Sequence, residues 1–133
     1  MIEGMIEKVK HYLPLKILEV YCDKARFNMY GTGWSFYTLS VWRICTNDKM
    51  ILGCFDEDSS QIVNILKNIE ILDITFQSDS LKIDPVFILS NNQRMEIFST
   101  DTYEPWVFNL DDVAIYVATP SEPNAFDTTQ KQS

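Results

Sequence analysis

From residue 15 to residue 118 the sequence is a succession of short apolar segments, and this pattern restricts the fold more than any other feature. The segments are rich in Val, Ile, Tyr, Phe and Trp and end at turn-forming pairs such as Asn47-Asp48. Such segments are typical of β-strands joined by tight connections. The predicted strands occupy residues 15–22, 25–31, 34–45, 49–55, 69–77, 80–84, 86–90, 94–98 and 112–118.

Two segments show helical periodicity instead. In residues 2–13 the apolar side chains recur at three- and four-residue spacing, which predicts one buried helix face, and Pro14 ends the pattern. A second, short helix is predicted over residues 59–68, where Ser59 or Ser60 could cap the free amides.

The two halves of the chain resemble each other. Residues 16–30 and 70–84 each contain an Ile-Leu-acid-aliphatic strand, a polar turn and a second strand. Each is followed by a further strand and a tryptophan, Trp42 in the first half and Trp106 in the second. If this is a repeat, it predicts two β-meanders related by pseudo-symmetry, with the helix over 59–68 as the crossover; the loose match leaves coincidence as the other explanation.

These patterns predict an α+β fold. Most of it is antiparallel β-sheet, built as two meanders in a sandwich or half-open barrel, with an N-terminal helix and one short crossover helix. A chain of 133 residues has the length of one domain, which is predicted to span residues 1–119. Residues 120–133 are almost free of apolar side chains, so a flexible C-terminal tail is expected there.

The net charge of −8 lies entirely in the second half. Residues 1–67 contain eight basic and eight acidic side chains, whereas residues 68–133 contain three and eleven. Such a field repels phosphate backbones and anionic lipids and attracts cationic proteins, so neither direct nucleic-acid binding nor membrane binding is expected. Solubility is the other explanation for the acidity.

Cysteine usage and the N-terminus predict a cytoplasmic protein. The charged first 13 residues lack the apolar centre of a signal peptide, and no apolar run is long enough to span a bilayer. Cys22, Cys45 and Cys54 include no C-x-x-C pair, so we expect reduced, mostly buried thiols and neither a disulfide nor a zinc site.

No recognisable arrangement of catalytic residues is present, and the chain is predicted not to be an enzyme and to need no cofactor or metal. His11 is the only histidine, which leaves no other base for a Ser-His or Cys-His pair. Residues 56–58 offer three carboxylates but lack the alternating oxygen ligands of a calcium loop, so a helix N-terminus is the better explanation. A ligand pocket lined by Trp34, Tyr37 and Trp42 is an open alternative.

The segment STDTYEPWVFNLDD, residues 99–112, combines aromatic and acidic side chains. Pro105 lacks the amide hydrogen that a central strand needs, so the residues from Tyr103 to Trp106 are expected at a sheet edge or in a loop. Trp106 could simply cover the core. Alternatively, the exposed edges of the aromatic rings, surrounded by acids, could bind a basic partner. The predicted contact residues are Asp101, Tyr103, Glu104, Trp106, Asp111 and Asp112.

The order of these elements resembles that of small bacterial immunity proteins of contact-dependent growth inhibition and related polymorphic-toxin systems. The resemblance covers about residues 15–118 and rests on short segments such as VWRI, MEIF and YEPWVF, in which Tyr103, Glu104 and Trp106 match a Y-E-x-W type motif. It implies a non-enzymatic cytoplasmic protein that binds a cognate toxin domain, commonly a basic nuclease, and blocks its active site or substrate path. No catalytic residue carries over.

The acidic second half fits such an inhibitor, because it presents the same sign of charge as the phosphates that a nuclease binds. The alternative from another class is a self-associating structural or adaptor domain that pairs through exposed strand edges as a homodimer.

Overall fold

The computed structural model describes residues 2–123 and 127–130. Its elements in chain order are α1 (Ile2–Lys10), β1 (Leu15–Lys16), β2 (Glu19–Asp23), β3 (Arg26–Gly31), β4 (Trp34–Thr38), β5 (Val41–Cys45), β6 (Met50–Gly53), the 3-10 turn η1 (Ser59–Gln61), α2 (Ile62–Leu66), β7 (Glu70–Phe76), β8 (Pro85–Leu89), β9 (Arg94–Phe98), β10 (Trp106–Leu110), β11 (Ala114–Val117) and β12 (Asp127–Gln130). The predicted α+β class is confirmed. None of the described helices is long and apolar enough to cross a membrane.

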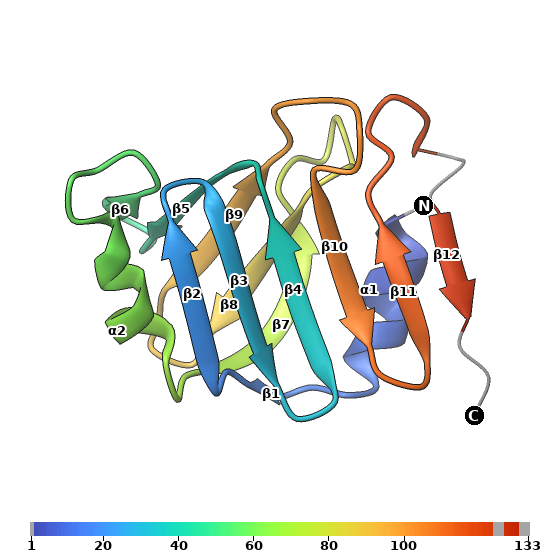
Figure 1. Ribbon diagram of the computed structural model, residues 1–133, viewed down its shortest axis with the longest axis horizontal. Helices are drawn as coiled ribbons and strands as arrows, with labels where there is room; N and C mark the ends of the chain where they lie inside the picture. Colours follow the sequence, from blue (N-terminus) through green and yellow to red (C-terminus); the bar gives the residue numbers. More distant parts are fainter. Residues whose placement is uncertain (1, 124–126, 131–133) are drawn as a thin grey trace.

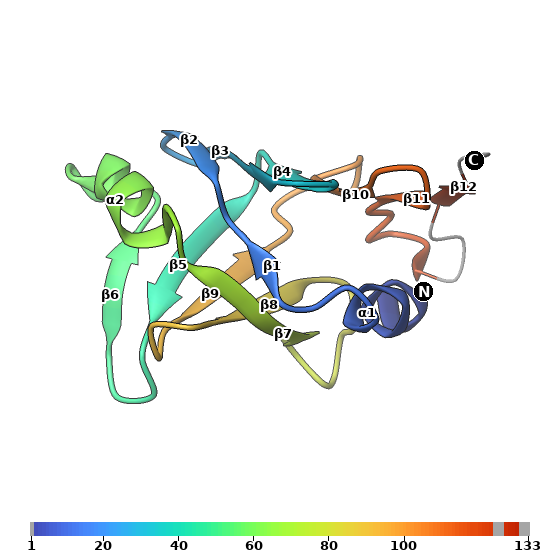
Figure 2. The same cartoon turned by 90° about the horizontal axis from the view of Figure 1, so that it is seen from below.

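The strands form two antiparallel sheets that pack face to face (Figure 1 and Figure 2). Sheet A has the strand order β1-β7-β8-β9-β5-β6, and sheet B has the order β2-β3-β4-β10-β11-β12. Buried side chains from both sheets and both helices form one core cluster.

Each half of the chain exchanges strands with the other half. The meander β2–β3–β4 of sheet B continues into β5 and β6, which extend sheet A. The meander β7–β8–β9 of sheet A continues into β10 and β11, which extend sheet B. Because β5 pairs with β9 and β10 pairs with β4, the halves are related by a pseudo-two-fold axis. This arrangement agrees with the predicted pair of meanders joined by a helical crossover.

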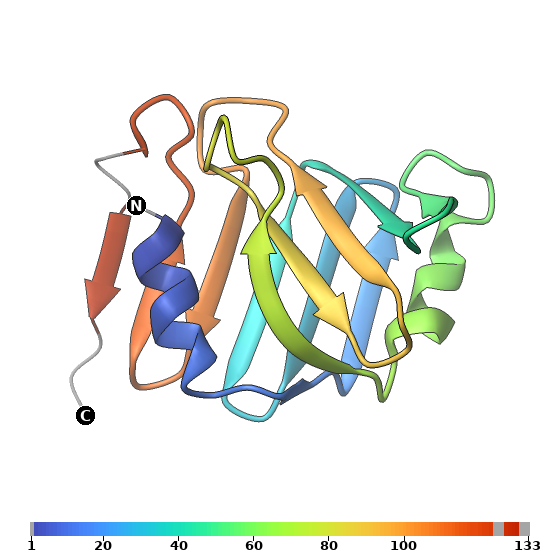
Figure 3. The ribbon, with the colours of Figure 1, turned by 180° about the vertical axis from the view of Figure 1, so that it is seen from behind.

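The helices lie at opposite ends of the sandwich (Figure 1 and Figure 3). Helix α1 packs beside β7 and α2 packs beside β2, so each contacts the first strand of the other half's meander. The helical spacing of Ile2, Met5, Ile6 and Val9 is confirmed, since all four are buried. The predicted serine cap is wrong: Ser59 begins the 3-10 turn, and no side chain caps η1 or α2.

Aromatic side chains occupy the space between the sheets. The rings of Phe36 and Phe87 meet edge to face at 4.9 Å, and Phe36 also lies 6.0 Å from Trp106. Offset and edge-to-face contacts of this kind add to the stabilisation that burial provides.

The predicted ligand pocket around Trp34, Tyr37 and Trp42 is wrong. Both indoles are fully buried in the core and donate their N–H groups to backbone carbonyls, Trp34 to Lys16 at 3.2 Å and Trp42 to Lys24 at 2.9 Å. Tyr37 follows Trp34 by an odd number of residues in β4, so its side chain points to the opposite face of the sheet.

The predicted strand over residues 34–45 is two strands in different sheets. The chain passes from sheet B to sheet A at Leu39 and Ser40, where the Thr38 hydroxyl donates to the carbonyl of Pro105 at 3.0 Å and accepts from the Ser40 amide at 2.9 Å. These bonds hold the corner without Gly or Pro.

Three further strand predictions need correction. Residues 15–22 divide between β1 and β2, and residues 80–84 form no strand. Strand β10 lies inside sheet B, although Pro105 precedes it. The proline stands one residue before the ladder begins, so its missing amide hydrogen removes no bond.

The predicted flexible tail differs from the structure over Asp127–Gln130. These residues form β12, which pairs with β11 at the edge of sheet B. An edge strand is held by backbone hydrogen bonds and needs few apolar side chains, so composition alone missed it. Residues 124–126 and 131–133 of the predicted tail lie outside the described residues.

Candidate protein-binding surface

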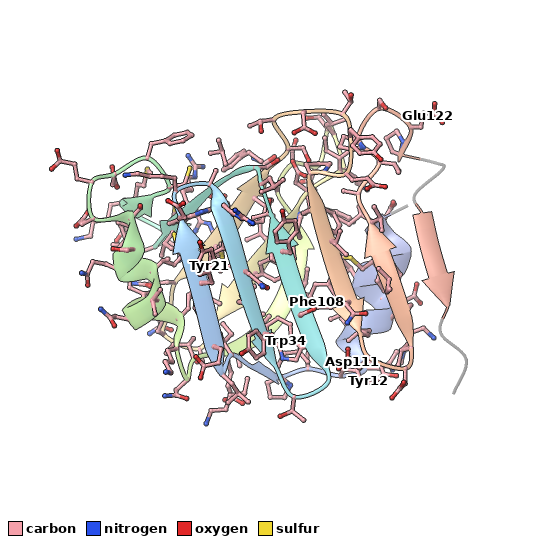
Figure 4. The ribbon with its side chains drawn as sticks, in the orientation of Figure 1. Tyr12, Tyr21, Trp34, Phe108, Asp111 and Glu122 are labelled. Atoms are coloured by element: carbon pink, nitrogen blue, oxygen red, sulfur yellow. The ribbon has the colours of Figure 1, made fainter. Side chains whose placement is uncertain are left out.

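Strand β10 divides the predicted contact residues into two groups. Asp101, Tyr103 and Glu104 lie on the loop before it, and Asp111 and Asp112 lie on the turn after it. A strand of five residues is about 17 Å long, so the groups lie at opposite ends of sheet B. Figure 1 shows the loop and the turn at the two ends of β10, and Figure 4 places Asp111 at the lower end.

Trp106 belongs to the core. Its exposed fraction is 0%, and its indole N–H donates to Oδ1 of Asp84 at 3.0 Å. The prediction that an edge of Trp106 is exposed to a partner is therefore wrong. Its predicted burial is confirmed, but Trp106 lies in strand β10, with its ring between the two sheets, and does not fold over the core from a loop.

Asp111 and Asp112 stabilise the β10–β11 turn. Oδ1 of Asp111 accepts from the side-chain Nδ2 of Asn109 at 2.7 Å, and the backbone N–H of Asp111 donates to the carbonyl of Gly33 at 2.9 Å. Asp112 has a φ of 60°, a left-handed conformation that Asp tolerates better than most residues. The turn explains both aspartates without a partner.

The β9–β10 loop projects an aromatic side chain into solvent. Tyr103 is 81% exposed, and its amide donates to Oδ1 of Asp101 at 3.0 Å. Glu104 has a φ of 46°, an uncommon conformation for this residue type. The equivalent β4–β5 connection needs only residues 39–40, whereas this loop uses residues 99–105. The additional residues are not required to join the strands and form a projection that carries Tyr103.

The buried carboxylate of Asp84 holds both ends of this loop. Oδ2 accepts from the Ser99 amide at 2.6 Å, and Oδ1 accepts from the Ser99 hydroxyl at 2.5 Å and from the Trp106 indole. Burial raises the pKa of Asp84 above its ordinary value, although the bonds from Ser99 and Trp106 favour the charged form. Tyr103 is therefore presented from a fixed base.

An open apolar hollow of about 440 Å³ lies on sheet A next to the base of the loop. Val41 and Phe98 line it. They pair across β5 and β9 at the end of these strands from which residues 99–105 continue. Met50 and Phe55 form its other wall and are 53% and 72% exposed.

Leu39 connects the hollow with the loop. It is 50% exposed, precedes Val41 by two residues and donates its amide to the carbonyl of Pro105 at 3.1 Å. We group four residues of the hollow with the exposed apolar residues of the two neighbouring connections under the name apolar strip; it consists of Phe55, Met50, Phe98, Val41, Leu39 and Tyr103.

Acidic side chains border the apolar strip at both ends. Phe55 is followed by the exposed residues Asp56, Glu57 and Asp58, and Tyr103 lies between the exposed Asp101 and Glu104. No basic residue stands within either segment, although Nζ of Lys24 donates to the carbonyl of Asp56 at 3.5 Å. Apolar anchors inside a charged rim are typical of protein interfaces, and the sign of this rim favours a basic partner.

The arginine at the hollow is paired with a carboxylate. Nε of Arg43 donates to Oε1 of Glu96 at 2.6 Å, and its guanidinium lies 4.9 Å from the centre of the Phe98 ring. Arg94 approaches the other carboxylate oxygen of Glu96 at 3.6 Å. Desolvation acts to raise the pKa of Glu96, but the hydrogen bonds from Arg43 and Cys45 and the two positive charges hold it below its ordinary value. Because two guanidinium groups share one carboxylate, this cluster keeps one net positive charge beside the hollow.

Sequence reasoning missed the part of the strip that sheet A contributes. Phe55, Met50 and Leu39 were assigned to strands, where an apolar residue is expected to be buried. The recognisable signal was Phe55 itself, an aromatic residue followed directly by three acids. Among the described residues, no group of three or more His, Cys, Asp or Glu side chains could hold a metal ion.

Comparisons of the chain with protein-family models, characterised proteins and solved structures gave no match. The surface is consequently interpreted from its own chemistry, an apolar hollow and exposed aromatic side chains beside acids.

Proposed function

We propose that the protein is an immunity protein that binds and neutralises a cognate basic toxin domain through the apolar strip and its acidic border. The observation that carries this proposal is the pair of exposed aromatic side chains, Tyr103 and Phe55, each placed beside acids on a short connecting segment.

The two components of the surface have different roles in binding. Burying a side chain as large as Phe contributes about 1.5–3 kcal/mol, so Phe55 and Tyr103 are the expected anchors. The acids accelerate association with a positively charged domain and disfavour other acidic proteins. A nuclease-type toxin uses positive charge to hold phosphate, and the acidic border competes for the same charge. The protein acts in the cytoplasm, a location that suits three free cysteines.

The test is affinity capture from lysate of the source cells, with the protein as bait and washes at low and high salt. One variant bait carries both Phe55→Ser and Tyr103→Ser. The matched control bait carries Tyr12→Ser, which removes a 45% exposed tyrosine far from the strip. The captured protein is then expressed with and without the immunity protein, and growth is recorded.

We expect a basic protein that the wild type and Tyr12→Ser retain at low salt and that Phe55→Ser/Tyr103→Ser loses. This protein should arrest growth when expressed alone and not when the immunity protein is present. Equal retention by all three baits would show that the strip is not the binding surface. Growth arrest that co-expression does not relieve would exclude immunity, and recovery of the bait alone would favour the self-associating alternative.

A further inference from the structure

The outer faces of the two sheets differ in charge although they are related by the pseudo-two-fold axis. Strand register aligns the outward side chains in rows that cross each sheet. On sheet A the rows are Thr75–Val86–Glu96–Arg43–Gly53 and Asp73–Ile88–Arg94–Cys45–Met50. On sheet B the rows are Tyr21–Asn28–Tyr37–Val107–Val117 and Glu19–Tyr30–Ser35–Asn109–Ile115.

Sheet A carries charged side chains at the centre of its outer face, beside the Val41–Phe98 pair that belongs to the apolar strip. Its rows contain both signs of charge, and Arg43 and Arg94 lie against Glu96.

On sheet B the charged outward positions lie at the margins: Glu19 and Asp23 on the edge strand β2, Arg26 at the start of β3 and, by register, Asp127 on the other edge strand, β12. The centre of the face, on β4, β10 and β11, is uncharged. The remaining side chains are tyrosine, asparagine, serine and β-branched aliphatic residues. Depletion of charge with enrichment of tyrosine is characteristic of interfaces, and Tyr, Ser and Asn together dominate antibody paratopes.

This face is open in the single chain. Tyr21 and Tyr30 are 55% and 48% exposed, and Figure 4 shows Tyr21 on β2 of sheet B. Both helices lie at the ends of the sandwich, and Figure 2 shows neither of them above the outer side of β2, β3 and β4.

We propose that two copies of the chain pack through the outer faces of their B sheets as a two-fold dimer. A protein with a net charge of −8 repels its own copies, so association requires a face on which little charge is brought together. Tyrosine, asparagine and serine side chains both donate and accept hydrogen bonds, and a face that carries them can be complementary to itself.

The size of the face sets the expected strength. Five strands and five residues per strand give a footprint of about 24 by 17 Å, or about 400 Å² in flat projection. A standard interface buries about 800 Å² of accessible surface on each partner, and projecting side chains add accessible area to a flat projection. The flat footprint is about half the standard size, so we expect a weak dimer whose population depends on concentration. The dimer leaves the apolar strip uncovered, because the hollow lies on sheet A.

Sedimentation velocity from low micromolar to several hundred micromolar protein tests this proposal. Tyr37 is half-buried at the centre of its row, between Asn28 and Val107. Tyr37→Glu and Tyr37→Lys place like charges opposite each other in a two-fold dimer, and each should weaken dimerisation at least about tenfold, or 1.4 kcal/mol. An equimolar mixture should recover the dimer as a heterodimer. Tyr103→Glu, on the β9–β10 loop, is the matched control and should dimerise like the wild type.

A wild-type chain that stays monomeric throughout this range would overturn the proposal. So would a dimer that neither Tyr37 variant weakens, since it would have to form elsewhere, for example through strand edges. Circular dichroism verifies that the variants fold; should the Tyr37 variants fail to fold, Asn28→Asp and Asn28→Lys on the adjacent strand serve in the same design. These outcomes are independent of the toxin-binding proposal, because the capture experiment alters only the apolar strip and Tyr12.

Discussion

Replacement of Asp84 by alanine should destabilise the protein through one specific buried group. The carboxylate accepts from the amide and hydroxyl of Ser99 and from the indole N–H of Trp106. Ser99 is half-buried, so its donors can bond to water, but Trp106 is 0% exposed and its N–H loses the Asp84 acceptor inside the core. A hydrogen bond to a charged acceptor contributes about 1.5–3 kcal/mol. Removal of the buried Asp84 charge acts in the opposite direction, because that charge no longer has to be desolvated. We therefore expect a loss of unfolding free energy toward the lower end of this range.

Urea unfolding at neutral pH measures this loss, and a double-mutant cycle with Trp106→Phe assigns it to the indole bond. Asp84→Ala should cost less in the Trp106→Phe background, because the donor is already absent. A change in unfolding free energy below about 0.5 kcal/mol, or equal costs in both backgrounds, would refute the assignment, since surface substitutions alone fall within that limit.

The pH dependence of Asp84 has a defined sign. Because burial raises its folded-state pKa, the folded protein binds this proton more tightly than the unfolded chain does. Its contribution to stability therefore falls as pH rises through the window that begins near the unfolded value of about 3.9. Asp84→Asn should remove this dependence, which unfolding curves at several pH values would detect.

Two further predictions concern the outer face of sheet A. Glu96 has a lowered pKa in the folded protein, so the stability it contributes should be present above the unfolded value of about 4.3 and be lost as pH falls through its folded pKa. In Glu96→Gln the free energy of unfolding should not show this loss. The same dependence of the unfolding free energy on pH in wild type and variant would contradict the prediction. Burial raises the pKa of Cys45, which is 5% exposed, so its thiol should react with a disulfide reagent at pH 8 much more slowly in the folded protein than in denaturant. The reaction rates are measured by mass spectrometry of the labelled peptide. Equal rates in the folded protein and in denaturant would show that the Cys45 site opens readily.

Local periodicity was sufficient to predict much of the fold. The spacing of Ile2, Met5, Ile6 and Val9 identifies α1, and most strands follow from β-rich segments between turn residues. The internal repeat was also visible, because Trp42 and Trp106 each follow a meander in the sequence and lie in the strand that crosses to the other sheet.

Assignment of strands to sheets could not be predicted in this way. The corner at Leu39 and Ser40 contains no Gly or Pro, and it depends on a hydrogen bond between Thr38 and Pro105, which are distant in sequence. Single-sequence patterns contain no information on such contacts. For this reason residues 34–45 were predicted as one long strand, although they form two strands in different sheets.

The candidate surface was predicted in part. Asp101, Tyr103 and Glu104 are exposed together, as expected. The other three residues were grouped with these wrongly, because nearness in sequence does not fix their place in the fold. Strand β10 places Asp111 and Asp112 at the other end of the sheet, and Trp106 is buried at its start. Phe55 was missed because the strip is formed by residues from both halves of the chain, and only the fold brings them together.

Binding through the β9–β10 loop is tested most directly with two charge-reversed variants. For each variant, the dissociation constant of its complex with the captured basic protein is measured. Asp101→Lys/Glu104→Lys alters the border of the apolar strip, whereas Asp111→Lys/Asp112→Lys changes the net charge equally at the opposite end of β10. If the border of the apolar strip binds the partner, the first variant binds at least about tenfold more weakly at low salt, a loss of about 1.4 kcal/mol, and the second binds nearly as well as the wild type. Equal weakening by both variants would show that only net charge matters and would contradict a defined binding surface at the β9–β10 loop.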